Sequence, residues 1–402
     1  MRLYRNTLYE EENKSMQDNF EAEFLNNILH FQPITIPEST HFWMIRTQKG
    51  YFYNEFISRG FVALAWNNID ECTDFTHQSK ELLKDDIIIT FPEIKRPSTV
   101  INKCNNFINK VKENDILVIP SKGSQFVTFA LAGEYFEDES KTVDLEKSVI
   151  YRIKNNDVDI NDVSCPYKKR RKISVLRTIK SDDVNVSLYR AISNYHGISN
   201  LDDYSYHILN ELYNCYTYKN YTALVYNVRK ATPIKPRELS SFIYANTECL
   251  CTIMPEDNLS IQTELHSPGD IIYFLKDMYS VAKDNWGIVL GLLVMLGGGS
   301  ALSFKVPGLI DIIKNALLIP QEIKSKKLEN DTKEVELQLK RLELQKNLKD
   351  SGINPESLIT SLDSIIENTS SLRVEPINLE NSSEEIPSAI SENEESTDID
   401  EV

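Results

Sequence analysis

The chain has 402 residues, of which 41% are hydrophobic and 26% are charged. This is the composition of a globular protein of about two or three domains, and it excludes a chain that is disordered throughout. The formal net charge is −16, but ten acidic residues and no Lys or Arg follow Arg373. The rest of the chain is therefore only mildly acidic, and its composition is compatible with a basic surface.

The cysteines and the first residues indicate an intracellular environment. Six cysteines are present, without a Cys-x-x-Cys pair and without a His at ligand spacing from a Cys pair. This pattern predicts reduced thiols, no metal site and no cofactor. Residues 1–20 contain no apolar stretch of the signal-peptide type, so we expect no export and a cytoplasmic head.

Residues 1–40 are predicted to be an N-terminal extension, and the first domain is assigned to residues 41–180. Strands outnumber helices in this domain, which predicts an α+β head built on a small open β-barrel. Its predicted strands are Phe42–Arg46, Phe61–Trp66, Ile116–Pro120, Phe126–Gly133, Ser148–Ile153 and Ile173–Thr178, and its predicted helices are Tyr51–Arg59 and residues 98–112.

Residues 181–275 are predicted to form a second α+β domain. Pro236 is placed at a helix start, where its missing N–H is not needed. The predicted helices are Val184–Tyr195, Leu201–Cys215 and Pro236–Tyr244, and the predicted strands are Thr222–Val228 and Ile271–Leu275.

The hydrophobic segment, Trp286–Phe304, contains no charged residue. A helix needs about 20 apolar residues to cross a bilayer core, so this length is just sufficient. Trp286 and Lys305 are typical interface anchors at its two ends. We expect residues 286–319 to associate with a membrane; the alternative is a buried helix of the second domain. The predicted lipid contacts are Trp286, Leu290, Leu293, Leu296 and Phe304.

Residues 322–349 are predicted to form a helical coiled-coil stalk. Leu328, Val335 and Leu342 recur every seven residues, as in the seam of paired helices. We therefore expect a homo-oligomer held together by the stalk. Residues 369–402 are rich in Ser, Glu and Asn and are predicted to form a disordered acidic tail.

The basic run, Lys168–Lys172, consists of five consecutive Lys and Arg residues, namely Lys168, Lys169, Arg170, Arg171 and Lys172. Such a run is suited to the phosphates of nucleic acid or of anionic lipid. The alternative is a solvated loop. The turn that contains Ser121 and Lys122 is included in the predicted nucleic-acid-binding surface.

Trp43 and Trp66 lie on predicted strands of the first domain. An aromatic ring on such a surface can stack against a base that has left its duplex. The alternative is plain packing in the core, and for Trp66 the apolar neighbours favour that alternative.

No catalytic constellation emerges from the sequence. Asp85 or Asp86 with Glu93-Ile94-Lys95 matches the metal-binding pattern of restriction nucleases, an acid followed by Glu-x-Lys. However, Pro92 interrupts the strand that would carry the pair. We therefore predict no catalytic or metal-binding residue.

The first domain also resembles a known family. Phe42–Arg46 and Gly60–Ile69 look like the amino-terminal domain that precedes the nuclease in some Mrr-type restriction proteins. Asn114–Gly123, followed by Phe129–Tyr135, is similar to EVE-like members of the PUA superfamily. The resemblance covers residues 41–180 and implies a small barrel that binds nucleic acid, often at a modified base. The Mrr-type nuclease pattern itself is missing from the rest of the chain.

Two functions are compatible with these features. The first is a membrane-associated sensor or effector of prokaryotic defence, in which the first domain recognises nucleic acid without catalytic activity of its own. The alternative is a soluble restriction-type nuclease, or its specificity subunit, with residues 286–319 buried.

Overall fold

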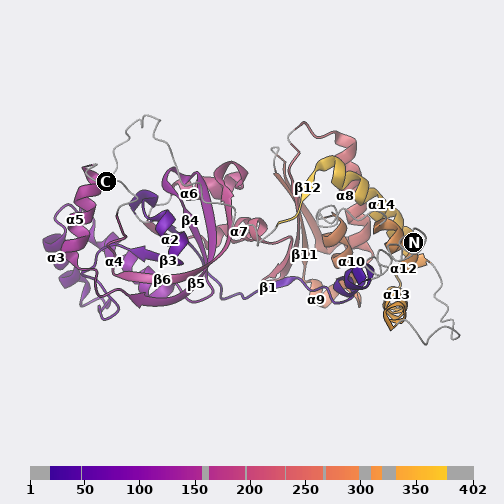
Figure 1. Cartoon of the computed structure of the whole chain (residues 1–402), viewed down its shortest axis with the longest axis horizontal. Helices are drawn as coiled ribbons and strands as arrows, with labels where there is room; N and C mark the ends of the chain where they lie inside the picture. Colours follow the sequence, from indigo (N-terminus) through magenta and orange to yellow (C-terminus); the bar gives the residue numbers. More distant parts are fainter. Residues whose placement is uncertain are drawn as a thin grey trace, which may run out of the picture. The chain divides into compact units, whose positions relative to one another are not determined.

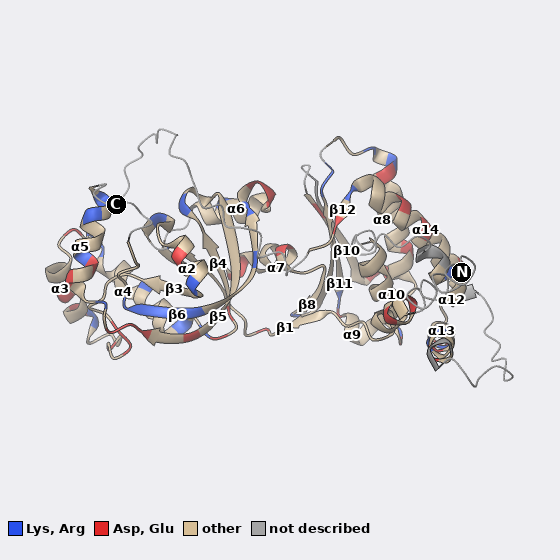
Figure 2. Cartoon of the chain, viewed as in Figure 1, with Lys and Arg blue, Asp and Glu red and all other residues tan. Residues whose placement is uncertain are grey.

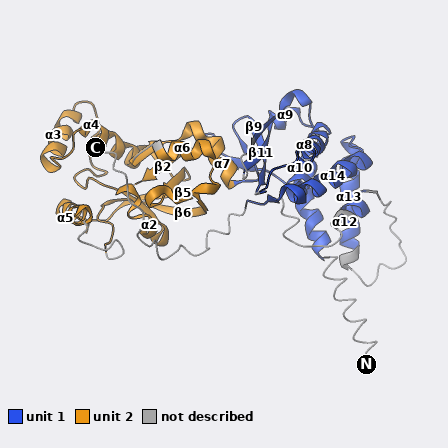
Figure 3. Cartoon of the chain, turned by 90° about the horizontal axis from the view of Figure 1, so that it is seen from above, with its two compact units in different colours: residues 1–38, 213–377 blue, residues 39–212, 378–402 orange. Residues whose placement is uncertain are grey.

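The protein is an α+β chain, and its computed structural model describes residues 19–46, 48–155, 163–194, 197–230, 232–265, 269–297, 309–318 and 332–377. The chain forms two compact units (Figure 3). Unit 1 combines residues up to Glu38 with Tyr213–Ile377, and unit 2 comprises Ser39–Leu212. Unit 2 is therefore an insertion in the sequence of unit 1.

Unit 2 is built on a curled sheet, the half-barrel, with strand order β3-β6-β5-β4-β2-β7 (Figure 1). Neighbouring strands are antiparallel, except for the parallel pair of β2 and β4. The strands are β2 (Phe42–Arg46), β3 (Phe61–Leu64), β4 (Ile116–Pro120), β5 (Phe126–Glu137), β6 (Lys169–Lys180) and β7 (Gly197–Asn200).

Two helices of unit 2 begin or end at a residue that favours a helix boundary, either a proline or a glycine. Helix α2 ends at Gly60, which has a φ of 66° and so takes the left-handed conformation favoured by glycine. Pro97 occupies the first turn of α4, where its missing N–H costs nothing. The helices are α2 (Tyr53–Arg59), α3 (Lys80–Thr90), α4 (Pro97–Asn105), the π-helix η2 (Asn106–Lys110), α5 (Val143–Lys154), α6 (Val186–Asn194) and α7 (Ser205–Leu212).

Unit 1 contains a second sheet, of order β1-β8-β9-β11-β10, with β12 beside β9. The short edge strand β1 lies parallel to β8, whereas the other neighbours are antiparallel. The strands are β1 (Ile34–Ile36), β8 (Cys215–Tyr218), β9 (Tyr221–Val228), β10 (Leu259–Leu265), β11 (Gly269–Lys276) and β12 (Val374–Glu375).

Helices gather on one face of this second sheet (Figures 1 and 3). They enclose one continuous apolar core with β9 and β11. The helices are residues 19–29, α8 (Pro236–Cys251), α9 (Met278–Val281), α10 (Trp286–Leu292), the π-helix η8 (Leu293–Gly297), α12 (Leu309–Leu318), α13 (Thr332–Asp350) and α14 (Pro355–Leu372).

The helix at residues 19–29 and Phe31, just after its end, pack closely on α10. A Cβ atom at Gly291 would lie 2.9 Å from Cβ of Phe31, and one at Gly287 would lie 2.8 Å from the carbonyl oxygen of Phe31. On its other side, Arg341 of α13 donates a hydrogen bond of 2.6 Å to the carboxylate of Glu21. The predicted N-terminal extension is thus, in its described part, an integral element of unit 1.

Several predicted boundaries differ from those observed. Residues 148–153 belong to helix α5 and not to a strand, because Thr142 caps the helix and Val149 and Ile153 form its buried face. The division between units falls at Tyr213 and not near residue 181. Residues 369–377 complete α14 and form β12, whereas 378–402 of the predicted tail lie outside the described residues.

Candidate nucleic-acid interface

The basic run begins just before β6 and continues into it, so it is not a loop (Figure 2). Side chains of a strand alternate between its two faces. Lys169 and Arg171 therefore point into the core of unit 2, whereas Arg170 and Lys172 point to the opposite face. The two faces have different neighbours, which decides what each cation does.

Lys169 is fully buried, with 0% of its surface exposed. Its ammonium group donates hydrogen bonds to the carbonyl oxygens of Trp66, at 2.6 Å, and of Ile69, at 2.8 Å. Burial lowers the pKa of this lysine, and the nearby carboxylate of Glu146 opposes the shift. Lys169 thus holds the loop after β3 and does not face solvent.

The two arginines of the run are also buried. The guanidinium of Arg171 donates to the carbonyl oxygens of Gly133, at 2.8 Å, and of Phe107, at 3.2 Å. Arg170 donates to the carbonyl oxygen of Tyr167 at 3.0 Å and forms an ion pair with Asp138 at 3.2 Å. The donors named here bind the fold itself, and the buried Nε of Arg171 has no hydrogen-bond partner among the described residues.

The two remaining lysines are paired with carboxylates. Lys168 lies 3.0 Å from Glu137, 3.2 Å from Glu139 and 3.5 Å from Asp70. Lys172 is exposed and lies 2.8 Å from Glu134. The prediction of a continuous phosphate-binding run therefore disagrees with the observed placement, and so does the alternative of a solvated loop.

Trp43 is a core residue with 4% of its surface exposed. Its indole N–H donates a hydrogen bond of 3.0 Å to the carboxylate of Asp115. Asp115 also accepts from the backbone N–H groups of His41 and Lys112. Neither face of this indole is open to a base, so core packing is the role of Trp43 in this structure.

Trp66 follows β3 and is only partly buried. Its φ of 68° lies in the left-handed region, which is a genuine outlier for a bulky residue. The buried carboxylate of Glu146 accepts from the N–H groups of Trp66, at 2.7 Å, and of Asn67, at 2.8 Å. Together with Lys169, this carboxylate fixes the strained turn from both sides.

Lys103, on α4, lies beside this turn. Its ammonium nitrogen is 6.0 Å from the centre of the Trp66 ring. Burial lowers the pKa of Lys103. It forms no ion pair with any residue that the structure describes. Sequence reasoning missed both Lys103 and Glu146, because neither stands in a motif and each lies far from Trp66 along the chain.

The predicted turn residues Ser121 and Lys122 stabilise the β4–β5 hairpin. The hydroxyl of Ser121 accepts a hydrogen bond of 3.0 Å from the N–H of Phe126. The ammonium of Lys122 lies 4.6 Å from the ring centre of Tyr51, within reach of a cation–π interaction. These two residues do not adjoin Trp66 in any contact that we observe among the described residues.

The described part of the hydrophobic segment, residues 286–297, contributes to the core of unit 1. Leu290, Leu293 and Leu296 are buried, and Trp286 is partly buried against the ring of Tyr279. Phe304 lies outside the described residues. Within the described ranges, no helix combines the length and the apolar character that a bilayer crossing requires. The placement matches the alternative of a buried helix.

The nuclease-like acids are on a helix and not on a strand. Asp85 and Asp86 lie on α3, and Asp86 accepts a hydrogen bond from Asn68. Over the part of the chain that the structure describes, no cluster of three or more His, Cys, Asp or Glu side chains is arranged to hold a metal ion.

Comparison with known proteins gives no family assignment: no family model, no curated protein and no solved structure matches this chain.

Proposed function

We propose that unit 2 is a nucleic-acid sensor that stacks an unpaired base on Trp66, with Lys103 beside the ring to attract the phosphate backbone. The strained conformation of Trp66 carries this proposal. Holding a bulky residue at positive φ costs on the order of 1–3 kcal/mol, and such strain persists mostly at functional sites.

The surroundings of Trp66 support the same role. The N–H and the carbonyl group of Trp66 are held by the buried side chains of Glu146 and Lys169. The backbone at Trp66 is therefore already ordered, and binding a base would cost little conformational entropy. Lys103 supplies a cation that has no carboxylate partner among the described residues. Stacking with a nearby cation is the usual design of sites for single-stranded nucleic acid.

Trp66→Asn tests the stacking directly, because Asn tolerates the left-handed conformation and removes the ring. We expect affinity for a single-stranded dT oligonucleotide to fall by about 1–3 kcal/mol, with an unchanged dependence on salt. Lys103→Gln should instead lower the slope of log affinity against log salt by about 0.7. Fluorescence anisotropy at several salt concentrations separates the two effects.

Lys172→Gln is the matched control, since it removes one exposed lysine from the opposite face of β6. This variant should bind as the parent does. If Trp66→Asn keeps its circular dichroism spectrum and also binds as tightly as the parent at every salt concentration, Trp66 is not the site.

We keep membrane association as a separate proposal. It requires the hydrophobic segment to leave the core of unit 1, because its described leucines are buried there. The nucleic-acid proposal for unit 2 does not depend on it.

We also propose that α13 pairs with a second copy of the chain. Leu337, Leu344 and Leu348 face the core of unit 1, whereas Val335 and Leu342 are only partly buried and Leu339 is 54% exposed. The helix thus has two apolar stripes, of which one is already packed. Leu328 of the predicted seam lies outside the described residues.

Replacing Leu339 and Leu342 with Asp should lower the mass measured by light scattering, because charges in an apolar seam repel each other. The double variant should keep the parent's helical circular dichroism. An unchanged mass would contradict pairing through this stripe. Leu344→Asp should behave differently from the double variant, because it places a charge on the buried stripe and should therefore unfold unit 1.

A further inference from the structure

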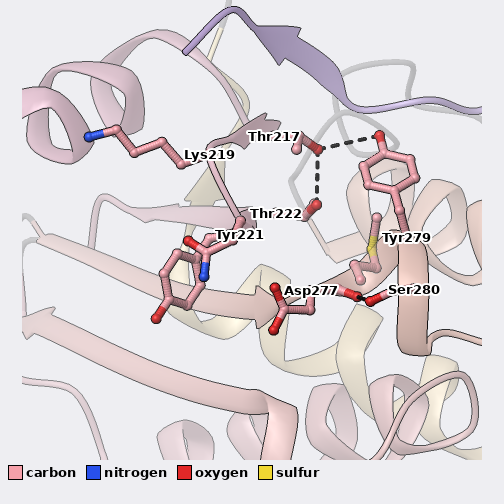
Figure 4. A pocket seen from close by; sticks show the side chains of 9 residues that line it. Thr217, Lys219, Tyr221, Thr222, Asp277, Tyr279 and Ser280 are labelled. Carbon is pink, nitrogen blue, oxygen red and sulfur yellow. Dashed lines mark hydrogen bonds between the residues drawn. The ribbon is translucent and has the colours of Figure 1, made fainter.

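A pocket of about 220 Å³ lies at one end of the sheet of unit 1. It is lined by residues of the β8–β9 hairpin, by Asp277 between β11 and α9, and by the first residues of α9 (Figure 4). Nothing in the nucleic-acid proposal for unit 2 involves this pocket.

Three hydroxyl groups line one side of the pocket. The hydroxyls of Thr217 and Thr222 lie 2.9 Å apart, and both residues are buried. The phenol oxygen of Tyr279 lies 3.5 Å from the hydroxyl of Thr217 (Figure 4). Each hydroxyl offers one proton but two lone pairs, so acceptors exceed donors along this side.

Asp277 also lines the pocket, and its carboxylate points toward Tyr221 in the view of Figure 4. Asp277 has a φ of 54°, and its N–H donates a hydrogen bond of 2.8 Å to the carbonyl oxygen of Asn220, which fixes the turn. Its carboxylate forms no hydrogen bond or ion pair with any side chain of the described residues. Asp277 is exposed, so the pocket carries a solvated negative charge that no side chain of the described residues pairs with.

No cation of the pocket lining compensates this charge. The ammonium of Lys219 lies 4.9 Å from the ring centre of Tyr218, and Figure 4 shows the lysine extending away from Asp277. The lining also includes two tyrosine rings, together with Asn220, Met278 and Ser280. Tyr279 is 57% exposed and rests edge-on against Trp286, with 5.3 Å between ring centres, while Tyr221 rests on Phe274.

We propose that this pocket binds a primary alkylammonium group on a short carbon chain. An ammonium has three N–H donors and no acceptor, which matches a carboxylate and a row of hydroxyl oxygens. Tyrosine rings attract a cation electrostatically and also cover methylene groups. A volume of about 220 Å³ admits the ammonium together with several methylenes. A free diamine and a lysine side chain share this chemistry.

Isothermal titration calorimetry on the full chain tests the proposal with two probes, 1,4-diaminobutane and Nα-acetyl-lysine amide. Binding of the diamine indicates a free amine as ligand, and binding of the lysine derivative alone indicates a protein side chain; either supports the site. Asp277→Asn should weaken binding by about tenfold or more, as expected for loss of a charged hydrogen-bond acceptor. Trp286 fluorescence should change on binding, because Trp286 contacts Tyr279.

Asp284→Asn is the control, because it neutralises an exposed acid of the same region that does not line the pocket. This variant should bind both probes as the parent does. The assignment is overturned if neither amine binds, if Asp277→Asn binds as tightly as the parent, or if neutral 1-butanol binds as well as the diamine. Asn accepts the left-handed conformation of residue 277, so the variant should melt at the parent's temperature.

Discussion

Lys169→Met is expected to destabilise unit 2 by about 3–5 kcal/mol, the usual cost of removing one partner from a buried set of charges. Methionine keeps the volume of the side chain but has no donor. The carbonyl oxygens of Trp66 and Ile69 would lose their ammonium partner, and the buried carboxylate of Glu146 would lose the positive charge of Lys169 that compensates it. Urea unfolding, followed by circular dichroism, measures the loss.

Lys172→Met is the matched comparison, because it lies three positions along the same strand with its ammonium in solvent. It should leave the unfolding midpoint unchanged. Adding Glu146→Gln to Lys169→Met should recover part of the lost stability, since the orphaned charge is then removed as well. Equal midpoints for the Lys169 and Lys172 variants would show that the buried lysine does not hold the turn at Trp66.

Gly291→Val is expected to lower the stability of unit 1 by about 1–3 kcal/mol through overpacking. A Cβ atom at this position would lie 2.9 Å from Cβ of Phe31 and 3.4 Å from Cα of Ile28. In a helix with free space around the glycine, replacing glycine with alanine would instead raise the free energy of unfolding, by about 0.5–1 kcal/mol. If Gly291→Ala lowers the stability of unit 1, the contact with Phe31 is tight. A gain in stability would show that there is room for a Cβ atom.

Phe31→Ala provides the partner variant for a double-mutant cycle. If the two residues compete for one space, Gly291→Val should cost clearly less in the Phe31→Ala background. Thermal unfolding of the four proteins gives the coupling. An additive result would mean that Phe31 does not restrain α10 through this contact.

The fold of unit 2 is largely readable from local patterns, because its strands and turns obey local rules. The strand at Phe42–Arg46 and the hairpin of Ile116–Pro120 with the strand from Phe126 are confirmed. Residues 148–153 are one exception: Val149, Ile150 and Tyr151 favour a strand, but the cap at Thr142 and the spacing of Val149 and Ile153 decide for a helix. Helix α3 and strand β7 are two further elements that the sequence analysis did not predict.

The candidate site was far less predictable than the fold. Alternation along a strand does assign Lys169 and Arg171 to one face, but sequence alone does not tell that both faces of β6 are covered at its start, where Arg170 is buried as well. The contacts that fix Trp66 come from Glu146 and Lys169, which lie 80 and 103 residues away. Such pairings depend on the tertiary fold, and no local sequence pattern predicts them.

The second apolar stripe of α13 illustrates the same limit. Heptad spacing identifies Leu328, Val335 and Leu342, whereas the leucines that pack on the core, Leu337 and Leu344, follow the same spacing on another side of the helix. When apolar residues surround a helix, periodicity shows that partners exist but not which side meets which partner.

The insertion of unit 2 between β1 and β8 sets the order in which the protein can be assembled during translation. Ser39–Leu212 emerges as one uninterrupted stretch and can fold while the rest is still being made. The helix at residues 19–29, in contrast, can form its bond from Glu21 to Arg341 only after 320 further residues have been synthesised. At about 5–20 residues per second, this synthesis takes tens of seconds. Its apolar residues Phe24, Leu25 and Ile28 belong to the core of unit 1, so nascent unit 1 exposes apolar surface until its later helices have been made.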